Sequence, residues 1–209
     1  MCIRDRQNQF AWVCCADFQW VRAHPMRKES EAHHTSSTVP KDVGIPVKMV
    51  VDNAKTQAQG QFQKKLREAD YRVKSIEPHT PFYNAAESAM RELKKRTGRI
   101  LTKSKCPKRL WDDCIELVAL QQSHTAHDAW QLRGQVPQTV MTGQTTDASQ
   151  LFESEWHELV KLFESATIFP NDKMLLGRCS GPLIDIGPTM TAKTAKSNGN
   201  TIHVSAHRA

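Results

Sequence analysis

Two carboxylates have the residue type and spacing that suit chemistry. Asp52 follows a short β-branched run, residues 47–51, and Glu87 stands near the start of a strongly basic segment. Thirty-four residues separate them (87 − 52 − 1). Carboxylate oxygens are ligands that Mg²⁺ prefers, and carboxylate-bound Mg²⁺ suits phosphodiester chemistry. The pair therefore suggests a metal-dependent site, provided that the fold brings the two side chains together.

Each carboxylate alone also has an ordinary structural explanation. Asp52-Asn53 could form a turn after a strand. Asn84-x-x-Glu87 matches a capping box, in which the Glu87 side chain reaches back to the start of its own helix. Taken one at a time, the two residues fit these structural roles better than a catalytic role.

The elements around the pair decide whether it can converge. Residues 47–51 are typical of a buried strand, and the pattern then predicts a helix over Gln59–Asp70 and a second strand over Tyr71–Glu77. A proline-punctuated loop, residues 78–83, leads to a long helix that begins near Asn84. In such a strand–helix–strand–helix unit, a carboxylate at a strand end can meet one on the following helix.

The predicted long helix carries the net charge of the whole chain. Six residues at 3.6-residue spacing form its inward stripe: Ala86, Met90, Leu93, Thr97, Ile100 and Leu101. Glu87, Arg91 and Lys94 share an adjacent face. From Glu87 to Arg109, nine basic residues stand against two acidic ones, a balance of +7 that equals the formal charge of the entire chain. Such a concentration indicates a surface for a phosphate backbone.

The segments around both carboxylates resemble a known family. Two stretches carry the likeness: Asp52-Asn53-Ala54-Lys55 and residues 77–87, Glu-Pro-His-Thr-Pro-Phe-Tyr-Asn-Ala-Ala-Glu. They resemble the second and third acidic positions of the retroviral-type integrase catalytic core, and those of copia-type retrotransposon integrases most closely. The likeness covers nearly the whole chain from about Gln9, with weaker matches at residues 107–111, 134–137, 143–149 and 176–178.

The resemblance implies a fold and an activity. The expected fold is α/β: a ribonuclease H-like core, with a mixed sheet flanked by helices, followed by a small β-barrel-like module. The implied activity is DNA integration, by DNA 3′-end processing and strand transfer with Mg²⁺ or Mn²⁺. By the same resemblance, Asp52 and Glu87 would be the catalytic metal ligands, and the DNA-binding residues would be Tyr83, Asn84, Arg91, Lys94 and Lys95.

Partners and location also follow from the resemblance. The partners would be DNA, both element ends and target, and further copies of the chain in a nucleoprotein complex. The location would be the nucleus, with a cytoplasmic particle as the alternative. No membrane partner is expected, because no apolar run approaches the roughly 20 residues of a spanning helix.

The sequence departs from the family at three points. The family's first aspartate has no match: Asp17 lies only 34 residues before Asp52 (52 − 17 − 1), at a predicted hairpin tip, and we expect the strand that should carry this aspartate to be missing. Ala85 replaces the usual glycine, and the zinc-binding amino-terminal module is absent. We therefore expect a partial core that is inactive alone. Two alternatives remain, a non-catalytic nucleic-acid-binding module and a ribonuclease H-like nuclease.

The remaining patterns predict the domain organisation. Residues 1–8 match neither a strand pattern nor the family, 9–130 form the partial core, 131–155 a linker with a short helix at Pro137–Met141, and 156–209 the β module. Within the core we expect a hairpin of Phe10–Cys15 and Phe18–Arg22, a helix after Pro25 and a second long helix over Leu110–Ala129. The β module should contain strands at residues 159–163, 167–169, 183–186, 190–195 and 201–205.

Composition agrees with a globular nucleic-acid-binding protein. The chain has 209 residues, 39% hydrophobic and 24% charged, and its pI of about 9.2 favours an acidic polymer as partner. The six cysteines show no disulfide-framework spacing, so reduced thiols are expected. His33-His34 lacks a cysteine pair at zinc-ligand spacing, and His124 and His127 are expected at the surface or bonded within the fold.

Overall fold

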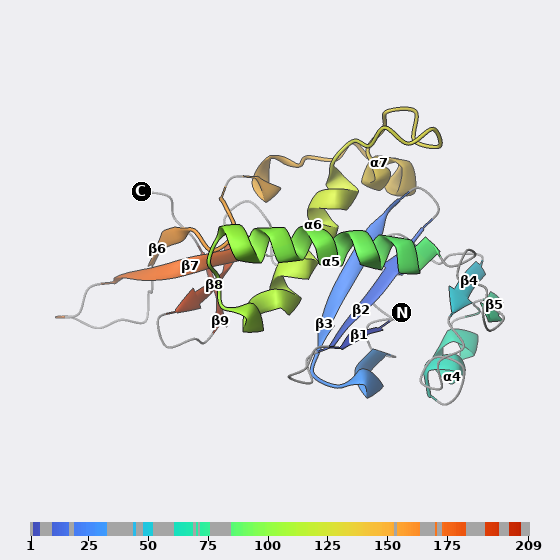
Figure 1. Cartoon of the computed structure of the whole chain (residues 1–209), viewed down its shortest axis with the longest axis horizontal. Coiled ribbons are helices and arrows are strands. Elements are labelled where there is room, and N and C mark those ends of the chain that lie inside the picture. The colour runs from blue at the N-terminus through green and yellow to red at the C-terminus, as the bar shows by residue number, and fades with distance from the viewer. Residues whose placement is uncertain are drawn as a thin grey trace.

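The computed structural model describes most of the chain as a mixed α/β fold (Figure 1). The described residues are 2–4, 10–16, 19–32, 44, 48–51, 61–68, 70, 72–75, 85–152, 154–163, 170, 173–182, 191–196 and 201–205. Their strands form three small sheets, two of them antiparallel and one a parallel pair. The predicted strands at residues 167–169 and 183–186, and the pair His33-His34, lie outside these residues.

The first sheet is antiparallel, in the order β1-β2-β3, with strands Cys2–Arg4, Phe10–Cys15 and Val21–Met26. The predicted hairpin is confirmed, although its second strand begins at Val21 and includes Pro25. The prediction that residues 1–8 contain no strand is wrong, because β1 pairs with β2 through Ile3 and Ala11. A three-residue strand is too short to show an alternating pattern of apolar residues. Its extended conformation depends on backbone pairing with the edge of β2, which the sequence pattern does not reveal. The sheet therefore includes a strand before the hairpin, and the expectation that no strand precedes the hairpin is wrong.

The predicted strand–helix–strand unit is confirmed. It consists of β4 (Lys48–Val51), α4 (Gln61–Glu68) and β5 (Arg72–Ser75), and β4 and β5 pair in parallel. Phe62 and Leu66 are the buried residues of α4, four positions apart on one helix face. They share a hydrophobic cluster with Val51 of β4 and Trp20 beside β3. This cluster, called the second cluster below, attaches the parallel unit to the first sheet.

The long basic helix is also confirmed, as α5 (Ala85–Lys103). Met90, Leu93 and Thr97, all from the predicted inward stripe, are buried. They face the first hydrophobic cluster, to which β2 and β3 contribute Ala11, Val13, Val21 and Ala23. The stripe therefore packs α5 on the first sheet and leaves its charged side to solvent.

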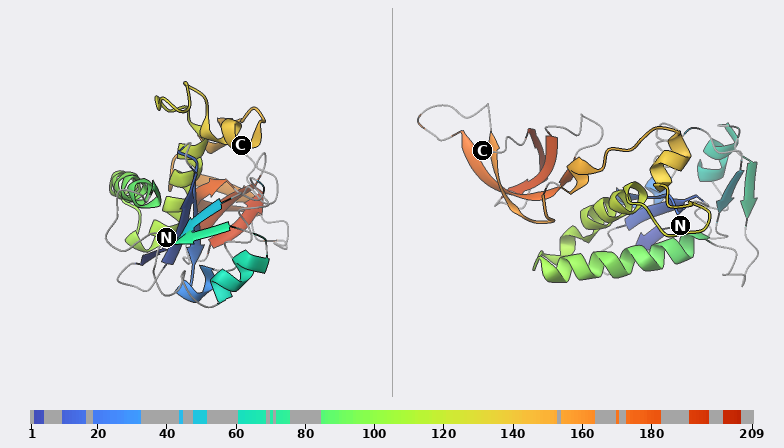
Figure 2. Two further views of the ribbon diagram at one scale, coloured as in Figure 1. Left: turned by 90° about the vertical axis from the view of Figure 1, so that its right-hand side faces the viewer. Right: turned by 90° about the horizontal axis from the view of Figure 1, so that it is seen from above.

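Helix α6 (Trp111–His124) follows the short 3-10 helix η3 (Lys108–Leu110) and is the central helix of the fold. It lies between the first sheet and the carboxyl-terminal sheet (Figure 2). Contact on both sides explains why eight of its fourteen residues are buried: Cys114, Ile115, Leu117, Val118, Ala119, Leu120, Gln122 and Ser123. The predicted helix over Leu110–Ala129 is thus confirmed, with an earlier end.

Polar contacts connect these helices to β3. The Ser123 hydroxyl donates a hydrogen bond to the Val21 carbonyl at 2.6 Å and accepts one from the Val21 N–H at 2.8 Å. Helix α7 (Pro137–Thr142), close to the predicted short helix, provides Gln138. Its Oε1 atom accepts hydrogen bonds from Trp20 at 2.7 Å and from Arg22 at 3.1 Å. Side chains of α6 and α7 therefore hold β3 in place.

The carboxyl-terminal sheet is antiparallel, in the order β6-β7-β8-β9. Its strands are Leu159–Phe163, Met174–Pro182, Thr191–Lys196 and Thr201–Ser205. The predicted strands 159–163, 190–195 and 201–205 are confirmed, and the hairpin between the last two is present as the β8–β9 pair. The described strands form an open sheet rather than a closed barrel, since no pairing joins β9 to β6.

Strand β7 was not predicted, because its small residues face inward and a large apolar residue faces outward, the reverse of the usual strand pattern. Gly177, Cys179 and Gly181 are buried, whereas Leu176 and Arg178 are exposed. The small buried residues permit close packing on α6: a Cβ at Gly181 would stand 3.4 Å from a methyl group of Leu117. Packing against a helix thus requires small residues where an isolated strand pattern would show large apolar ones.

Three shorter points complete the fold. Residues Glu29–Glu31 form the 3-10 helix η1 within the helix expected after Pro25, and the rest of that expected helix, from residue 33 on, lies outside the described residues; Ser149–Leu151 form η4. The described cysteines 14, 15, 106, 114 and 179 are free thiols. Among the described helices, none is long and apolar enough to cross a membrane.

Candidate functional site

Four of the seven predicted site residues lie on α5. Glu87 is the acidic residue of its first turn and is half-buried. Arg91, Lys94 and Lys95 follow one to two turns later and are exposed. The structure therefore brings Glu87, Arg91 and Lys94 together on one face of a helix, as their spacing predicts. Asp52, Tyr83 and Asn84 lie outside the described residues.

The structure describes strand β4 up to Val51, the residue directly before Asp52. Val51 ends β4, is 3% exposed and packs in the second cluster beside Phe62 and Leu66. The first turn of α5 points toward the β4–β5 unit in both Figure 1 and Figure 2. The predicted meeting of Asp52 with Glu87 stays a prediction, because Asp52 itself is outside the described part of the chain.

The charges along α5 separate into a neutral pair and a cationic row. Arg96 donates a hydrogen bond to Glu92 at 2.9 Å, and this bond, with the nearby positive charges, lowers the pKa of Glu92. Four further cations, Arg91, Lys94, Lys95 and Arg99, are exposed and form no ion pair with another described residue. These four cations form a positive row along α5 with no ion-pair partner among the described residues.

The Glu87 carboxylate fits the requirements of a metal ligand. No other described residue forms an ion pair or hydrogen bond with it, even though Arg91 stands one turn away. An oxygen donor that no described residue engages suits a hard divalent cation. No group of three metal-ligating side chains occurs within the described ranges, so Glu87 needs an additional ligand to hold a metal. Asp52 is the predicted one.

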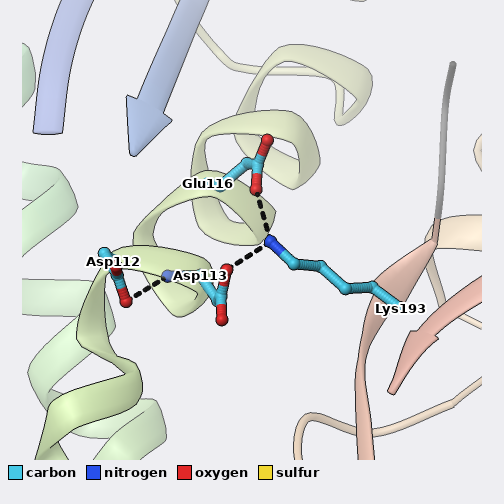
Figure 3. Close-up of polar contacts among 4 residues, drawn as sticks. All are labelled: Asp112, Asp113, Glu116 and Lys193. Atoms are coloured by element: carbon cyan, nitrogen blue, oxygen red, sulfur yellow. Dashed lines mark hydrogen bonds and ion pairs between the residues drawn. The ribbon is translucent and has the colours of Figure 1, made fainter. Parts of the chain in front are cut away.

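The structure also brings together an acidic group that sequence reasoning missed. Asp113 and Glu116, on the first turns of α6, both contact Lys193 of β8, and Asp112 stands beside them (Figure 3). Glu116 lies 3.4 Å from the Lys193 ammonium. Because the Lys193 ammonium already occupies the position between Asp113 and Glu116, the group joins two parts of the fold rather than offering a metal site. No local signal links residues 80 positions apart.

The titration of this group reflects burial as well as charge. Burial raises the pKa of Asp112, and the neighbouring Asp113 charge adds to the rise. Burial alone would lower the pKa of Lys193, but the Glu116 and Asp113 carboxylates outweigh it, and the pKa is raised. Lys193 therefore stays charged across the neutral pH range.

His124 and Cys114 of α6, and His127 just after the helix, serve the fold. His124 Nδ1 bonds to the Leu120 carbonyl at 2.8 Å, and His127 Nε2 to the Gln122 carbonyl at 2.7 Å. The prediction of satisfied histidines is therefore confirmed. Burial lowers the pKa of His124 and raises the pKa of the Cys114 thiol to about 12. A thiol so strongly protonated is a poor nucleophile, which agrees with a packing role.

Comparison with known proteins identifies the fold. The sequence matches no protein-family model and no curated protein sequence. The structure is similar to the catalytic core domain of BIV integrase, with a TM-score of 0.52 and 13% identity over 68% of this chain and 90% of that domain. It is also similar to a chain of the simian T-cell lymphotropic virus intasome in complex with PP2A regulatory subunit B56 gamma, with a TM-score of 0.54 and 13% identity over 99% of this chain and 73% of that one.

These similarities confirm the resemblance at the level of fold. The chain has the mixed α/β fold of retroviral integrase catalytic core domains. The closer likeness to copia-type integrases stays a prediction from the sequence, as do the proposed domain boundaries.

Proposed function

We propose that this chain is the core of a retrotransposon integrase, closest to the copia type, which binds DNA along α5 and binds Mg²⁺ through Asp52 and Glu87. The observation that carries the proposal is the position of Glu87 in the first turn of α5, on one face with Arg91 and Lys94. This arrangement occurs within a fold similar to integrase catalytic cores. A carboxylate that adjoins exposed cations suits a site where a metal and a phosphate backbone meet.

Each residue has a distinct role in the proposal. Arg91, Lys94 and Lys95 bind backbone phosphates, while Glu87, fixed by the rigid helix, holds the metal together with Asp52. Tyr83 and Asn84, which precede the helix, add DNA contacts. When bound, Mg²⁺ would polarise the scissile phosphate and favour ionisation of the attacking hydroxyl or water.

The proposed reaction is phosphodiester transfer, and the chain by itself does not complete it. Two-metal phosphoryl transfer depends on ligands that hold both metals a few ångströms apart. The aspartate that bridges the metals in the family has no match in this sequence, so only Asp52 and Glu87 are assigned. Action in the nucleus, on element ends and target DNA and with further copies of the chain, belongs to the same proposal.

Metal binding tests the site directly. Mn²⁺ titrated into the chain and followed by electron paramagnetic resonance should bind to the unmodified protein and much more weakly to Glu87→Gln and Asp52→Asn. Glu92→Gln is the matched control, because Glu92 lies on the same helix but is already paired with Arg96. Equal Mn²⁺ binding by all four proteins would rule out the assigned ligands.

Strand-transfer assays test the limit on catalysis. With a labelled element-end duplex and Mg²⁺, the chain should give no more product than the Asp52→Asn/Glu87→Gln double variant. Robust transfer by the unmodified chain would contradict the proposed incompleteness.

The metal titration separates the proposal from one alternative function, and cleavage of RNA–DNA hybrids separates it from the other. A non-catalytic nucleic-acid-binding module would bind DNA through the same cations, yet Glu87→Gln would leave Mn²⁺ binding unchanged. A ribonuclease H-like nuclease would lose Mn²⁺ binding in the same variants, but it would cleave RNA–DNA hybrids, and the proposed integrase core would not.

A further inference from the structure

A glycine interrupts the cationic row of α5, and the described residues give no structural reason for it. Gly98 lies well inside the helix and is exposed. A Cβ placed on it would meet nothing within 4 Å, so no packing contact excludes a side chain. Its φ is not positive, so no left-handed backbone requires a glycine. A glycine inside a helix weakens that helix relative to alanine.

Cationic and polar side chains surround the position of Gly98 on the helix surface. Lys94 and Lys95 stand one turn before Gly98, Arg99 follows it directly, and Thr102 stands one turn later; all are exposed. The Thr102 hydroxyl donates to the Gly98 carbonyl at 2.8 Å, so the helix backbone remains satisfied there. The acidic residue of this stretch, Glu92, is paired with Arg96. The surface at Gly98 is therefore a shallow, positively charged gap.

We infer that this gap, formed by Gly98 within the frame of Lys94, Lys95, Arg99 and Thr102, is the point of closest approach between α5 and the sugar-phosphate backbone of duplex DNA. The inference rests on the proposed DNA binding and adds the contact that determines how closely the duplex can approach. Glycine is the residue that allows a ligand to approach a protein backbone without steric conflict.

The dimensions of the helix agree with a backbone rather than a single phosphate. From Arg91 to Arg99 the helix rises about 12 Å, at about 1.5 Å per residue. One DNA strand places about three to four phosphates over that length. Four exposed cations along this rise match that number, whereas a free phosphate ion would need its ligands concentrated at one point.

A size series at Gly98 tests the inference. Gly98→Ala and Gly98→Leu place progressively larger side chains in the gap, and both residues form helices better than glycine. The alanine variant should melt about 2–4 °C higher than the unmodified chain. DNA binding, measured by fluorescence anisotropy with a short labelled duplex, should weaken by roughly tenfold for alanine, as for the loss of about one phosphate contact, and further for leucine. Gln131→Leu, at an exposed loop position, controls for an added apolar side chain.

Heparin separates shape from charge, because a flexible polyanion can pass around a small side chain. The variants should bind heparin as the unmodified chain does, and equal losses for heparin and DNA would overturn the inference. Unchanged DNA affinity across the series would overturn it while leaving DNA binding on α5 intact. Lower helix stability in the alanine variant would overturn it too, since Gly98 would then serve the fold. A chain that binds no DNA at all would remove this inference together with the proposed function.

Discussion

Lys193 of strand β8 forms an ion pair with Asp113 in the first turn of helix α6, and so joins the carboxyl-terminal sheet to the central helix of the core. Both side chains are largely buried, at 21% and 13% exposure. The same lysine also contacts Glu116, one turn further along α6. One cation therefore lies between two carboxylates and reduces their mutual repulsion, and it does so only while β8 lies against α6.

Removal of this lysine should loosen the carboxyl-terminal sheet. Lys193→Met should lower the free energy of unfolding by about 1–3 kcal/mol, because it leaves Asp113 partly buried without a counter-charge. The double variant Lys193→Met/Asp113→Asn should recover part of the loss, since the uncompensated charge is gone. Urea denaturation measures both. Lys161→Met, at an exposed position of β6, is the control, and an equal loss there would contradict a specific role for Lys193.

Asp112 should make stability depend on acid pH. Burial, with the neighbouring Asp113 charge, raises its folded pKa above the ordinary 3.8. A carboxyl with a raised folded pKa favours the folded state when protonated, so its contribution is present below pH 3.8 and is lost as pH rises through the folded pKa. Asp112→Asn should therefore stabilise the chain at pH 7, on the order of 0.5 kcal/mol because the group is partly solvated, and give no gain below pH 3.8. Thermal melts across this pH range measure the difference, and a gain that persists at low pH would point to another cause.

Substitution of Ser123 should destabilise the fold more than substitution of Thr125, which follows α6. It bonds both the N–H and the carbonyl of Val21, which are buried at the edge of β3. Ser123→Ala should cost about 2–4 kcal/mol, because two buried backbone groups lose their partner at once. Thr125→Ala removes a hydroxyl that bonds the Gln121 carbonyl at an exposed site and should cost less than about 0.5 kcal/mol. Similar losses in the two variants, by urea denaturation, would argue against the β3 contact.

The cations of α5 should determine the salt dependence of DNA binding. The triple variant Arg91→Ala/Lys94→Ala/Lys95→Ala removes three proposed phosphate contacts. The slope of log affinity against log salt should therefore become less steep by about 2.7, at about 0.9 per phosphate contact. A variant that removes the exposed Lys64, Lys65 and Lys74 from α4 and β5 changes the net charge equally. If this matched variant reduces the slope as much, binding depends on total charge and not on α5.

The sequence alone predicted the elements whose evidence is local. The inward stripe of α5 and the buried pair on α4 follow the 3.6-residue period of a helix, and the chain shows this period whatever packs against it. The position of Glu87 in the first turn of α5, on one face with Arg91 and Lys94, follows from the same geometry. The candidate site was therefore readable in advance to the extent that it lies on a single helix.

Tertiary structure alone decided the contacts between elements that are distant in sequence. Strand β1 is defined by its pairing with β2, and the small inward residues of β7 make sense only against Leu117 of α6. The Lys193–Asp113 and Ser123–Val21 contacts join residues 80 and 102 positions apart, and the sequence near each residue does not indicate its partner. The physical reason is the sequence distance over which each feature acts. Periodicity shows which side chains of one segment share a face, whereas contact partners depend on how separate elements pack together.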